Sequence, residues 1–155
     1  EVLAAVRAAW PEHKPLSVRV SATDWFDHSD PHKGVTVDET VAICRALAEH
    51  GCDVVDVSTA GNTPESKPIY GRMYQVPFAE RIRFETGLPV LAVGAIQGAD
   101  HCNTVLAAGR ADLCALARPH LVNPSLVLGA AVEYEHDDQW WPDPYLPAKP
   151  RPPRS

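Results

Sequence analysis

The most informative stretch of the chain is Leu91–Pro124, LAVGAIQGADHCNTVLAAGRADLCALARPHLVNP. Its pattern predicts a strand, a glycine turn, a helix, a second strand and the start of another helix near Arg118. Two successive strand-to-helix junctions of one parallel sheet can hold one phosphate group. Backbone N–H groups at 94–96 and at the helix start would converge on the anion, and the Arg118 guanidinium would clamp it. The stretch therefore predicts the phosphate site of a (β/α)8 barrel and a phosphorylated cofactor.

The rest of the chain repeats the same alternation of strand and helix. Strands are predicted at Leu16–Ala22, Asp53–Ser58, Val90–Val93 and Asp112–Ala117, and helices at Val2–Trp10, Val37–His50, Val76–Thr86, Ala99–Ala108 and Asn123–Tyr134. Thr36 and Glu39 form a capping-box pattern before the second helix, and Asn123 is a candidate cap for the last helix. The proline-rich residues 140–155 predict an extended tail.

Near-continuous apolar strands that alternate with helices are typical of a parallel sheet buried on both faces. Four such units are half of a (β/α)8 barrel, which takes about 250 residues. An open sheet of the Rossmann or flavodoxin type is the alternative, but no GxGxxG sequence follows the first strand. We therefore predict an α/β fold in which residues 1–134 form the C-terminal half (strands five to eight) of a TIM barrel. Residues 135–155 are expected to form a proline-rich tail.

Composition and charge argue against several classes of protein. The 155 residues carry a formal net charge of −6 and no basic run, which is not typical of a nucleic-acid binder. No apolar stretch approaches the roughly 20 residues of a membrane span, and no signal peptide is visible. We therefore expect a cytoplasmic protein that does not bind membranes. Because the first residue is Glu1 and not Met, we expect the chain to begin inside a longer product or to have been cut.

The sequence predicts no metal site. Four cysteines without a CxxC pair are expected to be reduced thiols in a cytosolic core: Cys44, Cys52, Cys102 and Cys114. His28, Asp30 and His32 resemble metal ligands, but they lie in a polar turn without a third ligand on a helix or strand. We interpret this turn as a solvated loop.

Several polar residues near the predicted strand ends are candidates for chemistry. A cation such as Arg19 in the middle of a buried strand is costly unless it faces a partner. Arg19 would face a bound anion or an electron-rich ring at the barrel mouth, or a neighbouring carboxylate. Ser58 could hydrogen-bond a cofactor or form a turn. In the long loop 65–83, Tyr70, Arg72 and Tyr74 would contact substrate or pack the loop onto the barrel.

These residues occur in motifs that resemble a known family. VRVSATDW, VDVSTAG, YGRMYQVPFAERIR, AVGAI and GRADLCALARPHLVNP resemble, in order and spacing, the second half of the old yellow enzyme family of NADH:flavin oxidoreductases. The stretches YGRMYQVPFAERIR, ADHCNTVLAAGRADLCALARPHL and WWPDPYLPAK look most like one subgroup. That subgroup is the C-terminal reductase domain of salicylyl-CoA 5-hydroxylases and 2-aminobenzoyl-CoA monooxygenase/reductases. The resemblance covers residues 1–149.

The resemblance implies an FMN-binding barrel that takes hydride from NADH or NADPH. Arg19 matches an arginine beside the flavin ring whose charge stabilises the reduced flavin, which makes it the one catalytic candidate. Ser58 matches a residue near the ring, while Gly94, Ala95, Ala117 and Arg118 fall in the phosphate-binding segments. The family commonly has glycine where this chain has Ala117, so an extra methyl lies near the phosphate path.

The resemblance also implies parts that this chain does not contain. The family's substrate-activating His/His or His/Asn pair and its proton-donating tyrosine would precede Glu1, and the implied partner is the N-terminal half of the barrel. The predicted function is hydride transfer from NAD(P)H to an activated unsaturated acceptor, with an aromatic acyl-CoA derivative as one candidate small-molecule substrate. The alternatives are an inactive half-barrel that acts only in association, including as a homo-oligomer, and another phosphate-binding barrel such as an isomerase or aldolase.

Overall fold

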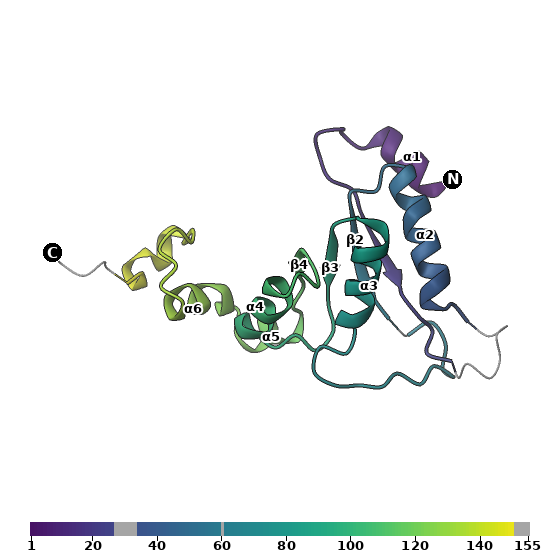
Figure 1. Ribbon diagram of the computed structural model, residues 1–155. Coiled ribbons are helices and arrows are strands. Elements are labelled where there is room, and N and C mark those ends of the chain that lie inside the picture. Colours follow the sequence, from purple (N-terminus) through teal and green to yellow (C-terminus); the bar gives the residue numbers. More distant parts are fainter. Residues whose placement is uncertain (27–33, 60, 151–155) are drawn as a thin grey trace.

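A computed structural model describes residues 1–26, 34–59 and 61–150 of the chain and shows an α/β fold (Figure 1). The four strands are parallel, and their order in the sheet is their order in the sequence: β1 Ser17–Ser21, β2 Val54–Ser58, β3 Val90–Ala92 and β4 Leu113–Cys114. The helices are α1 Val2–Ala9, α2 Val37–Glu49, α3 Val76–Thr86, α4 Ala99–Ala107, α5 Arg118–Val122 and α6 Leu126–Glu133, followed by the 3₁₀ helix η1 Asp143–Ala148. The predicted order of alternating strands and helices is confirmed.

The core lies on one face of the sheet. Val55 and Val57 of β2 are fully buried, together with residues of α2, α3 and α4 such as Val41, Ile82 and Val105. The side chains of the opposite face remain partly open, and Leu113 is 50% exposed there. Because right-handed crossovers between strands in sequential order place every helix on the same face, this is the arrangement of consecutive units of a (β/α)8 barrel. A doubly wound sheet would be covered on both faces.

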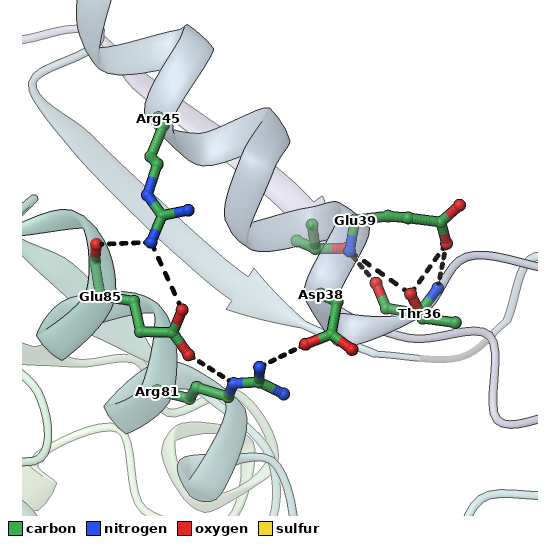
Figure 2. A network of polar contacts seen from close by, with 7 residues as sticks. Thr36, Asp38, Glu39, Arg45, Arg81 and Glu85 are labelled. Carbon is green, nitrogen blue, oxygen red and sulfur yellow. Dashed lines mark hydrogen bonds and ion pairs between the residues drawn. The ribbon is translucent and has the colours of Figure 1, made fainter.

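Helices α2 and α3 are joined by polar contacts as well as by the core (Figure 2). The predicted capping box is confirmed, since Thr36 N–H donates to Glu39 Oε2 at 2.8 Å and Glu39 N–H donates to Thr36 Oγ1 at 3.3 Å. Arg81 of α3 donates to Glu85 at 2.7 Å and pairs with Asp38 of α2. Arg45 of α2 donates to the Glu85 carbonyl at 3.1 Å. These contacts fix the register of two helices that begin 39 residues apart.

The C-terminal part differs from the sequence prediction. The predicted helix Asn123–Tyr134 is wrong at its start, because Asn123 ends α5 and α6 begins at Leu126. Asn123 is extended, as expected of a residue before proline, and its Oδ1 accepts from Ser125 N–H at 3.1 Å. The tail is not extended throughout, since η1 begins with a proline in its first turn, where a missing N–H costs no helix bond. Helix α6 and η1 project away from the sheet (Figure 1).

Three further expectations bear on this fold. Strand β4 is shorter than the predicted Asp112–Ala117 at both ends. Just before it, the Asp112 side chain accepts from Val90 N–H at 2.9 Å and pairs with Arg83. His28, Asp30 and His32 lie outside the described residues. Within the described ranges there is no group of three or more side chains able to hold a metal ion. No helix of that part is long and apolar enough to cross a membrane.

Candidate functional site

A small pocket lies where the β3–α4 and β4–α5 junctions meet. Its volume is about 90 Å³, and Gly94, Ala95, Ala117 and Arg118 all line it. The structure therefore brings together the four residues that the sequence predicts for phosphate binding. This follows from the sheet order, because β3 and β4 are neighbours and their carboxyl ends open at the same edge.

The backbone of this pocket has an uncommon conformation. Gly94 has φ +102° and Ala95 has φ +53°, so two successive residues have left-handed or related φ values, which a side chain disfavours. Such turns can direct successive N–H groups toward an anion. Ala117 has φ −108°, an ordinary value for an L-residue, so its methyl group is accommodated without backbone strain. The alanine in place of glycine therefore does not strain the backbone between β4 and α5.

Gln75 lies beneath the Gly94 turn, and the sequence analysis did not single it out. Its side chain is only 4% exposed, and its Nε2 donates to Tyr74 Oη at 2.6 Å. Its Oε1 is buried without a hydrogen-bond partner among the described residues. A Cβ at Gly94 would lie 2.6 Å from Gln75 Cδ, so the two residues interlock. The only sequence signal was a polar residue at the end of a long loop, immediately before α3.

A larger pocket of about 530 Å³ adjoins the first one. Tyr70, Gly71, Arg72, Ala95, Gln97 and His101 line it, so Ala95 and Gln97 are shared by the two pockets. Two of the three predicted substrate residues, Tyr70 and Arg72, therefore meet there. Tyr74 does not line this pocket but packs edge-on against Tyr70, with 5.3 Å between ring centroids. His101 of α4 is a pocket residue that the sequence analysis missed, because a single histidine in a helix gives no distinct signal.

Arg19 forms an ion pair on the open face of the sheet. Arg19 and Asp56 are register partners on β1 and β2, and Arg19 Nε lies 3.5 Å from Asp56 Oδ2. The Arg19 side chain is 58% exposed in this chain, because it lies on the sheet face that points away from the core. Of the two partners left open by the sequence, the neighbouring carboxylate is the one that the structure shows.

Asp56 is the more buried member of this ion pair. Burial raises the pKa of the Asp56 carboxyl, and the Arg19 guanidinium partly offsets that rise. Asp56 Oδ1 is buried without a hydrogen-bond partner in the described part of the chain. Ser58 lies two residues further along β2, and its carbonyl accepts from Ala22 N–H at 2.7 Å. Arg19 and Ser58 thus share one sheet face but do not line the two pockets.

Two curated proteins of similar sequence are NADPH dehydrogenases. The chain is 44% identical over 133 residues to an NADPH dehydrogenase of Geobacillus thermodenitrificans, covering 86% of the chain and 37% of that protein. It is 42% identical over 131 residues to an NADPH dehydrogenase of Clostridium acetobutylicum, covering 84% and 37%. The chain thus spans about 37% of the length of these relatives.

The fold also matches a solved enzyme. A structure of 2-naphthoyl-CoA reductase in complex with 2-naphthoyl-CoA superimposes with a TM-score of 0.70 at 20% identity, over 86% of this chain and 20% of that one. The family model named for NADH:flavin oxidoreductases and NADH oxidases, a group of FMN oxidoreductases, matches residues 1–137. The expected resemblance to the NADH:flavin oxidoreductases is confirmed at the level of the family. The chain belongs to the NADH:flavin oxidoreductase / NADH oxidase family.

Proposed function

We propose that this chain forms the phosphate end of the flavin site in an FMN-dependent oxidoreductase. The observation that carries the proposal is the pocket in which Gly94, Ala95, Ala117 and Arg118 meet. Arg118 forms no ion pair and donates no hydrogen bond within the described residues, so its guanidinium is free to bind an anion there. A phosphate ester is the anion that a guanidinium and converging backbone N–H groups bind best.

Different residues of this chain would contact the phosphate and the ring of the flavin. FMN, when bound, supplies the group that accepts hydride from NADH or NADPH. Arg118 would hold the phosphate, and the N–H groups of the Gly94–Ala95 turn would bind its oxygens. Arg19 would place a positive charge beside the ring, and Asp56 would hold the guanidinium in position. Ser58 would lie near the ring edge on the same sheet face.

We further propose that the sheet is the strand five to eight half of the barrel, with its open face closed by a preceding half. The sequential strand order and the single helical layer support this. The proposed acceptor is an activated unsaturated compound, and the resemblance of three stretches to the reductase domain of salicylyl-CoA 5-hydroxylases favours an aromatic acyl-CoA derivative. Tyr70, Arg72 and Tyr74 would form the wall on which this substrate docks.

The test measures FMN retention by the full-length protein. We expect protein incubated with FMN and then desalted to keep a flavin spectrum that NADPH bleaches. Replacing Arg118 with alanine should weaken FMN affinity by about tenfold or more, because a charge-assisted bond contributes about 1.5–3 kcal/mol. Arg19→Ala should keep FMN but slow its reduction. Arg45→Ala removes a paired surface arginine on α2 and serves as the control.

Two results would contradict the proposal. A wild-type protein that never retains flavin would show that no flavin site exists. Retention that is the same in Arg118→Ala and wild type would show that the pocket at Gly94 does not hold the phosphate.

A further inference from the structure

The arginines of this acidic chain are almost all paired with carboxylates. In the described ranges, every arginine other than Arg72 and Arg118 forms an ion pair with an aspartate or glutamate. These two unpaired cations line adjoining pockets that share Ala95 and Gln97. Since Arg118 belongs to the proposed phosphate pocket, Arg72 is a second cation available for a second anionic group beside it.

His101 adds a hydrogen-bond donor to the same pocket as Arg72. The backbone N–H of Gln97 donates to His101 Nδ1 at 3.1 Å. Because a backbone N–H can only donate, Nδ1 carries no proton and the neutral ring carries its proton on Nε2. The other ring nitrogen of His101, Nε2, makes no hydrogen bond within the described residues, so its N–H is a donor available to a ligand. The hydrogen bond from Gln97 also fixes the orientation of the ring.

An aromatic side chain lines the same pocket as these donors. Tyr70 lines the pocket and is 73% exposed, so most of its ring is open to a ligand. Tyr74 packs against the Tyr70 ring, and the ring centroids of Tyr74 and Trp25 are 6.4 Å apart. Trp25 in turn packs edge-on against Phe78 of α3, 5.3 Å away. These successive aromatic contacts connect Tyr70, in the loop, to helix α3.

We infer that the pocket formed by Tyr70, Arg72 and His101 binds the adenine nucleotide part of a ligand, with its phosphate on Arg72 and His101 and its base against Tyr70. The pocket volume of about 530 Å³ lies in the range of ordinary ligand sites. This inference rests on the proposed function, because it places a second nucleotide beside the flavin pocket. NADPH and an acyl-CoA both carry a phosphorylated adenosine, so the test uses a separate probe for each.

The experiment is a calorimetric titration of the protein with FMN in excess, so that the Arg118 pocket is filled. The probes are adenosine 2′,5′-bisphosphate, the phosphate pattern of NADPH, and coenzyme A, with adenosine as the probe without phosphate. Arg72→Met should weaken the binding of one phosphorylated probe by about tenfold or more, and His101→Leu should weaken it several-fold. Arg45→Met should bind as wild type does.

The outcomes separate this inference from the proposed function. Binding of the bisphosphate that depends on Arg72 assigns the pocket to the hydride donor, and the same dependence for coenzyme A assigns it to the acceptor. The inference is overturned if neither probe binds, or if Arg72→Met binds as tightly as wild type while FMN is retained. If FMN is not retained but a phosphorylated probe still requires Arg72, the proposed flavin site fails and the nucleotide pocket stands.

Discussion

Replacing Gly94 by alanine tests whether the phosphate turn and Gln75 are as tightly interlocked as the structure indicates. Gly94 has φ +102°, and an L-residue in such a conformation costs about 1–2 kcal/mol. The new Cβ would also lie 2.6 Å from Gln75 Cδ and 2.7 Å from Gln75 Oε1. Overpacking a buried site costs about 1–3 kcal/mol more. We therefore expect a loss of roughly 2–5 kcal/mol of unfolding free energy.

Thermal unfolding followed by circular dichroism measures this loss. For a chain of this length, 1 kcal/mol corresponds to about 2–4 °C, so the melting temperature should fall by about 4–20 °C. Gly87→Ala is the matched control, because Gly87 has φ +71° and a Cβ there meets nothing within 4 Å. It should show the backbone cost alone. The difference between the two variants then measures the steric conflict with Gln75.

A double variant isolates the contact itself. Removing the side chain with Gln75→Ala should recover most of the steric part of the Gly94→Ala loss, because the atoms that collide are then absent. The two substitutions should be strongly non-additive, as residues in direct contact are. The reasoning is refuted if Gly94→Ala costs no more than Gly87→Ala, or if the losses of the single variants simply add.

Three further predictions concern stability and thiol chemistry. Ala95→Gly should raise the unfolding free energy by up to about 1 kcal/mol in urea titrations, because φ +53° strains alanine more than glycine, and a loss would contradict this. The Arg83 guanidinium lowers the pKa of Asp112, so the ionised carboxylate stabilises the fold and Asp112→Asn should remove that stability. The difference between wild type and variant should be fully present above about pH 4 and disappear as the pH falls through the lowered pKa. Equal urea midpoints for wild type and Asp112→Asn at pH 7 would refute this. Burial raises the pKa of Cys114 to about 12 and that of Cys44 to about 11, so a disulfide reagent at pH 8 should label them rapidly only in urea.

The sequence predicted the local elements well where their signals lie within one turn of chain. Helix α3 begins and ends at the predicted residues, and the Thr36–Glu39 capping box forms as its spacing indicates. The prediction failed at Asn123, where two local signals compete. An asparagine can cap a following helix or end a preceding one, and the proline after it forces extended backbone, which ends α5.

The candidate site was predictable in part. The meeting of Gly94 and Arg118 follows from the order of strands, since neighbouring parallel strands end at one edge of the sheet. Gln75 and His101 were not predictable in this way. Their importance depends on the φ angle at Gly94 and on the Gln97 N–H, neither of which a residue pattern reveals.

The sequence by itself determined the alternating strands and helices, the family motifs and the glycine turn at Gly94, because each is a pattern of residues close together in the chain. Only the tertiary structure decided which charges are neutralised. Arg19 meets Asp56 through strand register, whereas Arg72 and Arg118 meet no carboxylate of the described residues. The physical reason is that a salt bridge needs two side chains within about 4 Å, and residues far apart in sequence reach that distance only when the packing of strands and helices brings them together.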